Sequence, residues 1–251
     1  MNQKEIESLS IARHHQKCLQ TCQKLIQSDP ENPLPWKYAG KSLLALGKPK
    51  KAQQCLLKCH QLNNTDPETA KDIGNTYLSL GKADDASEWY IKSIKIDSNY
   101  APAISNLANL KRQSGSNKEA VNLYKQAIKA DPQLIQAYIG AAKSLTALKD
   151  FDTAKLYATK ALEINKDLPG ANEAMGIILQ QQKSTRQALI YYQNELAISP
   201  KSNTSLLNVG ILLLENGNSE EAIEIFERKE DYVSLGCSDT GKCITTETLW
   251  K

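Results

Sequence analysis

The chain has 251 residues, 24% of them charged, and a formal net charge of +3 at pH 7. A charge this small, with no run of Lys and Arg, argues against nucleic-acid binding, since such binders carry a pronounced basic stripe. No apolar run reaches the roughly 18 residues that a membrane helix needs, and the polar beginning MNQKEIESLS is unlike a secretory signal, so we expect a cytoplasmic protein without membrane contact.

Residues 1–32 form an irregular first segment. They align in register with the segments that follow, and they therefore predict a degenerate copy of the same unit. Cys18 and Cys22 lie about one helical turn apart in this segment, at positions that hold other small or aromatic residues further along the chain.

From residue 33 onward the chain repeats itself with a period of 34 residues. Alanine marks one position of every unit, at residues 52, 86, 120, 154, 188 and 222. A second column is always Gly or Ala, namely Gly40, Gly74, Ala108, Ala142, Gly176 and Gly210. A fixed period of this size is typical of stacked-repeat proteins. We count six full units: 33–66, 67–100, 101–134, 135–168, 169–202 and 203–236.

Each unit predicts two amphipathic helices joined by a turn, as residues 67–100 illustrate. Ile73 and Tyr77 recur at helical spacing in the first half, and Tyr90 lies on the apolar face of the second half. Gly81 separates the halves, where it can adopt the backbone angles that end a helix. We expect the small columns to lie where the two helices cross, because a larger side chain there would hold the helices apart.

These columns resemble the tetratricopeptide repeat, a helix pair with small residues at the helix crossing and an aromatic residue one turn beyond. The resemblance implies an all-α fold, a right-handed superhelical solenoid of antiparallel helix pairs with an inner groove lined by the first helix of each pair. It covers a degenerate first repeat over 1–32 and six tandem units over 33–236, and it leaves 237–251 as a C-terminal tail. Such repeats usually serve as non-catalytic scaffolds for protein–protein interaction. We therefore expect a peptide segment bound in the groove, no enzymatic activity and no cofactor.

Polar residues gather at the groove positions of the N-terminal half. We predict a peptide-binding groove formed by Lys37, Lys41, Lys71, Asn75, Asn106, Asn109, Arg112 and Lys143. Cations can hold carboxylates, and Asn amides can bond to a peptide backbone, which favours an acidic peptide or a free C-terminus as the ligand. The alternative interpretation is that these are the ordinary charged faces of exposed helices.

Part of this set is similar to the carboxylate clamp of chaperone-binding co-chaperones. Lys71, Asn75 and Asn106 match the first three places of that clamp. Gln136 and Gly140 stand at the two places where the clamp has basic residues, so the match is incomplete.

The C-terminal half is apolar at the corresponding positions. The residues that predict an apolar groove or interface are Ile177, Leu207, Ile211 and Leu214. The helix expected over 205–214 is apolar on almost every side, which indicates that the tail, a partner or a continuation of the chain covers it. No helical apolar pattern follows Lys229, so the array lacks the polar cap of most repeat proteins. Self-association through this uncapped end is a further hypothesis.

Four of the six cysteines form two pairs at helical spacing, Cys18 with Cys22 and Cys55 with Cys59. One interpretation is a four-thiolate zinc site between the first two units. The other, which we favour, is that they are small core residues, as free Cys commonly is, and that the chain holds no metal.

The sequence matches a phosphate-binding motif in part. Residues 236–243 read GxxxxGK followed by Cys, whereas a P-loop has Ser or Thr there to bind Mg²⁺. The alternative function is therefore a substrate-recruiting repeat region of a sulfotransferase- or glycosyltransferase-type enzyme whose catalytic domain is absent from this chain.

Overall fold

The computed structural model describes residues 3–234, and within them it contains only α-helices and the turns between them. In chain order the helices are α1 (Gln3–Ile11), α2 (His15–Ser28), α3 (Pro33–Ala45), α4 (Pro49–Leu62), α5 (Pro67–Ser79), α6 (Ala83–Ile96), α7 (Ala101–Gln113), α8 (Asn117–Ala130), α9 (Ile135–Ala147), α10 (Phe151–Ile164), α11 (Ala171–Gln181), α12 (Thr185–Ile198), α13 (Asn203–Glu215) and α14 (Ser219–Ser234). The predicted helix pairs are confirmed.

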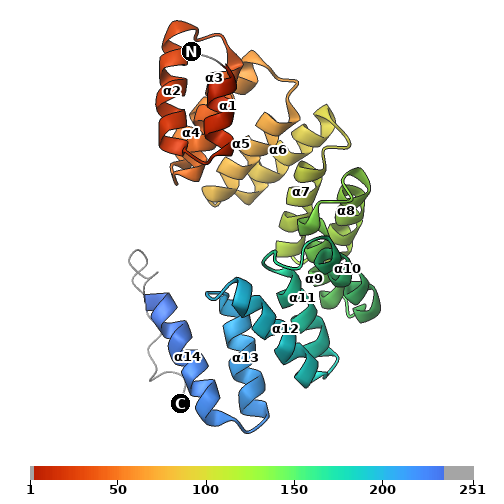
Figure 1. Cartoon of the computed structure of the whole chain (residues 1–251). Helices are drawn as coiled ribbons and strands as arrows, with labels where there is room; N and C mark the ends of the chain where they lie inside the picture. Colours follow the sequence, from red (N-terminus) through yellow and green to blue (C-terminus); the bar gives the residue numbers. More distant parts are fainter. Residues whose placement is uncertain (1–2, 235–251) are drawn as a thin grey trace. The chain divides into compact units, whose positions relative to one another are not determined.

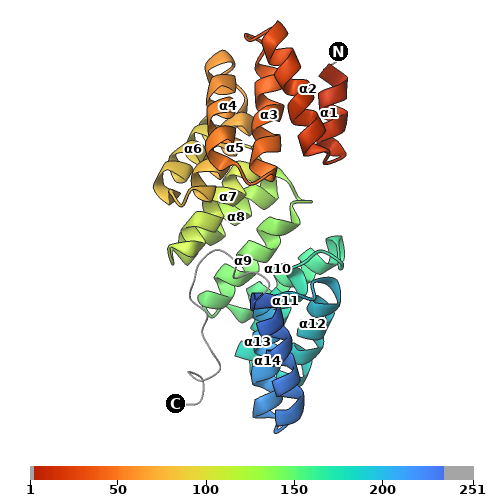
Figure 2. The same ribbon diagram turned by 90° about the vertical axis from the view of Figure 1, so that its left-hand side faces the viewer.

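The chain divides into two compact units, with the division inside α9. Unit 1 reaches to Gly140 and unit 2 begins at Ala141. Within unit 1 each helix packs beside the next, for example α3 against α4 and α5 against α6, and within unit 2 α13 lies beside α14 (Figures 1 and 2). Each unit is thus a stack of neighbouring helix pairs, as expected when a repeat buries its apolar face only against adjacent repeats.

The two small-residue columns lie at the helix crossings, as the sequence predicts. The alanines at 52, 86, 120, 154, 188 and 222 are all completely buried. A Cβ atom placed on Gly74 would lie 2.6 Å from a ring carbon of Tyr90, and one on Gly40 would lie 2.5 Å from Leu56 Cγ. These distances are too short for any additional atom, so the aromatic or leucine side chain fills the space that glycine leaves.

The third full unit departs from this pattern. It has Ala108 in the glycine column, and its aromatic residue, Tyr124, instead contacts Gly140 of α9. A Cβ atom on Gly140 would lie 2.3 Å from the ring of Tyr124. The absence of a side chain at 140, which weakens the clamp resemblance, therefore has a packing cause.

Two sequence expectations concern the C-terminal part. The helix α14 ends at Ser234, inside the predicted unit 203–236, and no further helix follows it within the described residues. The helix expected at 205–214 leaves Leu207 40% exposed and Leu214 44% exposed within the described residues, and the tail predicted to cover it lies outside them, so that expectation stays a prediction.

Candidate functional site

The predicted groove residues of unit 1 come from three successive first helices. Lys37 and Lys41 lie on α3, Lys71 and Asn75 on α5, and the remaining three on α7: Asn106, Asn109 and Arg112. The eighth, Lys143, lies in unit 2 and belongs to a different set of contacts.

The amides of α5 and α7 are joined to each other. The Nδ2 of Asn106 donates to Oδ1 of Asn75 at 2.9 Å, and the hydroxyl of Tyr90 donates to the same oxygen at 2.8 Å. Asn75 in turn donates through its Nδ2 to Oδ1 of Asp72 at 3.3 Å. The side chain of Asn75 therefore has a fixed orientation before any ligand arrives.

The same arrangement recurs one repeat later. The hydroxyl of Tyr124 donates to Oδ1 of Asn109 at 2.6 Å, and both residues stand 34 positions after Tyr90 and Asn75. Since this bond occupies the carbonyl oxygen of Asn109, its NH₂ group is the part left for other partners. The described residues offer that NH₂ group no acceptor.

Two lysines of α3 are neutralised by carboxylates of α5. Lys37 Nζ lies 2.8 Å from Asp66 and 2.5 Å from Glu68, and Lys41 Nζ lies 2.6 Å from the other oxygen of Glu68. Burial alone would lower the pKa of Lys37, but its two carboxylate partners outweigh burial and raise it. Burial would likewise raise the pKa values of Asp66 and Glu68, and hydrogen bonds with Lys37 lower both.

Lys71 is also paired, with the carboxylate of its neighbour Asp72. Asp72 is only 4% exposed, and its Oδ2 atom has no hydrogen-bond partner among the described residues. A buried carboxylate oxygen without a donor is costly, whereas the other oxygen, Oδ1, meets both Lys71 and Asn75.

Arg112 is the one cation of the predicted unit 1 set that has no carboxylate partner within residues 3–234. Its Nε atom is buried without a hydrogen-bond partner. Burial raises the pKa of the Tyr124 hydroxyl, and the nearby guanidinium of Arg112 opposes that rise. The positive charge of this face is therefore concentrated at Arg112.

Sequence reasoning missed the residues that organise the others. By sequence, Tyr90 lies on the apolar face of its helix and Tyr124 stands at the equivalent position of the next unit, yet the hydroxyl of each orients an asparagine. Asp66 and Glu68 stand at the start of α5, outside the expected groove positions, and their ion pairs remove the lysine excess on which the acidic-ligand prediction was based. The 34-residue spacing shared by the Tyr–Asn pairs is the signal that could have revealed the first two.

In unit 2, Lys143 Nζ lies 2.7 Å from Glu173, which also accepts a hydrogen bond from Ser202. Ile177 lies on α11, and the other predicted apolar residues lie on α13: Leu207, Ile211 and Leu214. Ile177 and Ile211 are half-buried, whereas Leu207 and Leu214 are exposed.

The cysteines lie in the protein core. Cys18 and Cys22 are completely buried in a cluster with Ile6 and Ala39, against which Cys55 packs, and Cys59 is 2% exposed. Burial raises the pKa values of the Cys22 and Cys55 thiols, which disfavours the thiolate that metals require. No cluster of three or more metal-binding side chains occurs in the described part of the chain.

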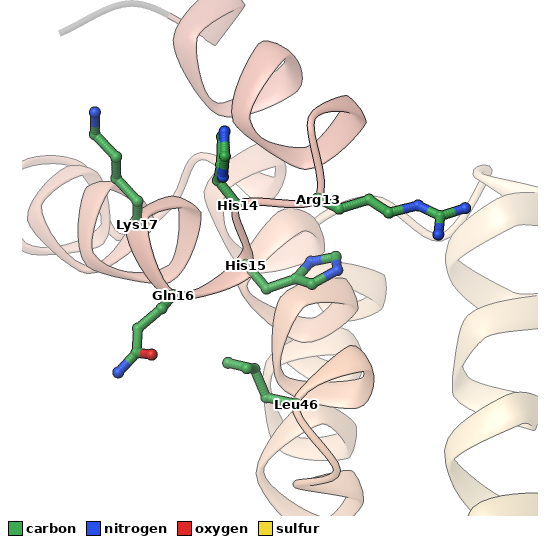
Figure 3. Close-up of a pocket in the computed structure, with 6 residues that line it drawn as sticks. All are labelled: Arg13, His14, His15, Gln16, Lys17 and Leu46. Atoms are coloured by element: carbon green, nitrogen blue, oxygen red, sulfur yellow. The ribbon is translucent and has the colours of Figure 1, made fainter.

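A hollow lies beside the turn between α1 and α2 and is lined by Arg13, His14, His15, Gln16, Lys17 and Leu46. Figure 3 shows Arg13, Gln16 and Lys17 pointing in different directions rather than toward a common point. This basic hollow is therefore not arranged to hold a single ligand group.

The glycine-rich segment 236–243 and the tail 237–251 lie outside the described residues. None of the helices within residues 3–234 is both long and apolar enough to cross a membrane.

Comparison with known proteins identifies the repeats. A family model described as tetratricopeptide repeat matches residues 72–100, 101–134 and 135–168. No curated protein matches significantly.

Solved structures resemble most of the chain. The APC/C hetero-tetramer Cut9-Hcn1 aligns with a TM-score of 0.80 at 14% identity over 90% of this chain, which spans 45% of that chain. PilF of Pseudomonas aeruginosa aligns with a TM-score of 0.64 at 18% identity, covering 82% of this chain and 91% of its own. YrrB, a TPR protein with an unusual peptide-binding site, aligns with a TM-score of 0.53 at 21% identity, covering 72% and 93%. At these identities the likeness establishes the all-α repeat fold and nothing further.

Proposed function

We propose that this chain, which is a tetratricopeptide-repeat protein, is a non-catalytic scaffold that binds an extended peptide segment of a partner protein across α5 and α7 of unit 1. Tetratricopeptide repeats are in general protein-interaction modules, and the peptide site is the finer part of the proposal.

The observation that carries the proposal is the pair of tyrosine–asparagine hydrogen bonds. Tyr90 and Tyr124 hold the carbonyl oxygens of Asn75 and Asn109, so the amide NH₂ group of Asn109 is left to meet a ligand acceptor. Fixing these amides in the free protein reduces the entropy lost when a ligand is bound. Peptide carbonyl oxygens and carboxylates are the acceptors that fit.

The charge of the ligand follows from Arg112 and not from the lysines. Because Lys37, Lys41 and Lys71 already have carboxylate partners, the unpaired guanidinium of Arg112 is the group available to a ligand carboxylate. The proposed ligand is thus a peptide whose main chain meets the amides and which carries one carboxylate at the Arg112 end.

YrrB gives limited support. It is a TPR protein with an unusual peptide-binding site, and its fold aligns with 72% of this chain. That relation makes a peptide site in such a repeat array plausible, whereas the choice of α5 and α7 rests on the contacts described above.

The test is a selection from a random-peptide phage library on the full chain, followed by fluorescence polarisation with the enriched peptide. Arg112→Gln is expected to weaken binding about tenfold or more, since hydrogen bonds to charged groups contribute about 1.5–3 kcal/mol. Asn109→Asp is expected to weaken it similarly, because the carboxylate still accepts from Tyr124 but can no longer donate to the peptide.

The matched control is Lys111→Gln. Lys111 is the sequence neighbour of Arg112 and has the same charge, but it pairs with Glu119 at 2.9 Å, so its loss should leave peptide affinity unchanged. Equal effects at 111 and 112 would mean that general charge attracts the peptide and that the proposed site is wrong.

A further inference from the structure

The last two described helices differ in charge from the rest of the chain. Residues 203–234 contain seven carboxylates and only two cations, Arg228 and Lys229, whereas the whole chain has a net charge of +3. The acids with described side chains are Glu215, Glu220, Glu221, Glu224 and Glu227, and all of them are exposed. None of these five forms an ion pair with a residue of 4–227, the range in which side chains are described. By sequence, the α13–α14 hairpin therefore carries five more carboxylates than cations.

The same hairpin exposes an apolar strip, which we define as Leu207, Ile211 and Leu214 of α13. Their spacing of four and three residues places them on one face of the helix. Leu207 is 40% exposed and Leu214 is 44% exposed. The other faces of α13 are occupied, because Leu206, Val209 and Leu213 are buried and Gly210 contacts Phe226 of α14.

We propose that the apolar strip of α13 is a docking surface for a basic amphipathic segment of a partner protein. Apolar side chains of the segment would bury Leu207 and Leu214, and its Lys and Arg residues would meet the unpaired carboxylates, beginning with Glu215 next to the strip. Charge complementarity selects this occupant, because Glu215 directly follows Leu214 of the strip and the hairpin carries five more carboxylates than cations, so an acidic segment would be repelled. The surface lies in unit 2 and is independent of the peptide site proposed for unit 1.

Two other occupants are separable by experiment. The C-terminal segment 235–251 contains as many acids as bases, so it has no net positive charge to match the hairpin. A second copy of the chain would bring an identical acidic hairpin into the same contact, which like-charge repulsion opposes. Both outcomes are nevertheless measured below.

The probe is a fluorescein-labelled amphipathic helix of about four turns made only of Leu and Lys, with a Leu–Glu peptide of the same pattern as its counterpart. The full chain is expected to bind the Leu–Lys peptide and not the Leu–Glu peptide. Leu207→Ser with Leu214→Ser should weaken the Leu–Lys peptide about tenfold, because both changes remove apolar area that binding would bury. Glu215→Gln with Glu220→Gln and Glu224→Gln should also weaken it, and this contribution should disappear in high salt.

The matched control is Leu156→Ser with Ile190→Ser. These side chains lie on α10 and α12 of the same unit and are even more exposed, at 67% and 54%. If the peptide merely adsorbs to exposed apolar side chains, this pair will reduce binding as much as the strip variant does, and the proposal is overturned. Circular dichroism of each variant confirms that the helices are retained.

Two further measurements distinguish the occupants. If removal of residues 235–251 strengthens probe binding, the tail occupies the strip in the intact chain and the proposal of a partner protein fails. If light scattering shows a dimer that the strip variant abolishes, the occupant is a second copy and the proposal fails as well. Unchanged probe affinity after truncation, together with a monomer, supports it.

Discussion

At the scale of single residues, the tyrosines of the repeat have two tasks. Tyr90 and Tyr124 are completely buried, so each ring fills the space beside a small residue while its hydroxyl reaches an asparagine on a first helix. Burial raises the pKa of Tyr90 to about 12, and the hydroxyl therefore stays protonated and able to donate at neutral pH. A packing residue thus also determines which end of a groove amide is offered to a ligand.

The close contact between Gly140 and the ring of Tyr124 gives a stability prediction. Gly140→Ala is expected to destabilise unit 1 by about 1–3 kcal/mol, although Ala is a better helix former than Gly by about 1 kcal/mol. The reason is that the new methyl group would lie 2.3 Å from a ring that is completely buried and cannot turn away. Urea unfolding followed by circular dichroism measures the change.

The control for this prediction is Gln136→Ala, an exposed position on the same helix, where a change within about 0.5 kcal/mol is expected. In a Tyr124→Leu background the penalty of Gly140→Ala should shrink, since the two substitutions share one contact. A Gly140→Ala protein as stable as the parent would show that Tyr124 does not need this space.

At the scale of helices, neighbouring first helices are joined by charged contacts. Lys37 of α3 reaches Asp66, which caps the N-terminus of α5, and Glu68 in the first turn of α5. Asp66 also accepts hydrogen bonds from the Glu68 backbone N–H and the Thr69 hydroxyl. A carboxylate at the beginning of a helix is favourable because the backbone N–H groups there lack partners. Asp66 therefore both joins α5 to α3 through Lys37 and stabilises the first turn of α5.

This cluster predicts a defined pH dependence. Lys37→Met should destabilise unit 1 by about 2 kcal/mol at pH 7, since it leaves partly buried carboxylates without their cation. Hydrogen bonds with Lys37 lower the pKa values of Asp66 and Glu68 in the folded protein. The two carboxylates therefore contribute their full stabilisation of the fold at pH values above their pKa in the unfolded chain, about 4. This contribution is lost as the pH falls through their pKa values in the folded protein. The stability difference between parent and variant should therefore shrink below about pH 4, as measured by urea unfolding at several pH values.

Lys58→Met is the matched control for that variant. Lys58 pairs with Glu31 at 3.4 Å, and both side chains are largely exposed, so its loss should cost at most about 1 kcal/mol. A Lys37→Met protein whose stability deficit is the same at pH 3 and pH 7 would contradict the assigned role of the cluster.

At the scale of the whole molecule, the two units carry different surface chemistry on a common framework. The ninth residue of each 34-residue unit shows how this chemistry changes along the chain. In order, these residues are Lys41, Asn75, Asn109, Lys143, Ile177 and Ile211. Polar residues occupy this position in unit 1 and two isoleucines occupy it later in unit 2. A single repeat geometry therefore presents an amide-rich face in one unit and an apolar face with acidic surroundings in the other.

We expect these two faces to act independently. Arg112→Gln should weaken the library-selected peptide and leave binding of the Leu–Lys probe unchanged, while Leu207→Ser with Leu214→Ser should do the reverse. The physical reason is that repeat arrays transmit contacts mainly to adjacent repeats, and substitutions without shared partners usually have additive effects. Both affinities are measured on each variant by fluorescence polarisation, and any variant that weakens both ligands equally would disprove the independence.

The sequence by itself determined the period, the helix pairs and the small residues at the helix crossings, because these depend on spacing within one unit and on volumes that recur every 34 residues. It also placed the groove residues on the first helices. Only the tertiary structure decided which of their charges and amides remain available. Lys41 meets Glu68 from 27 residues away, Lys143 meets Glu173 from 30, and Asn106 meets Asn75 from 31. Such pairings depend on how two repeats stack and on where long side chains end, which no pattern within a single unit records.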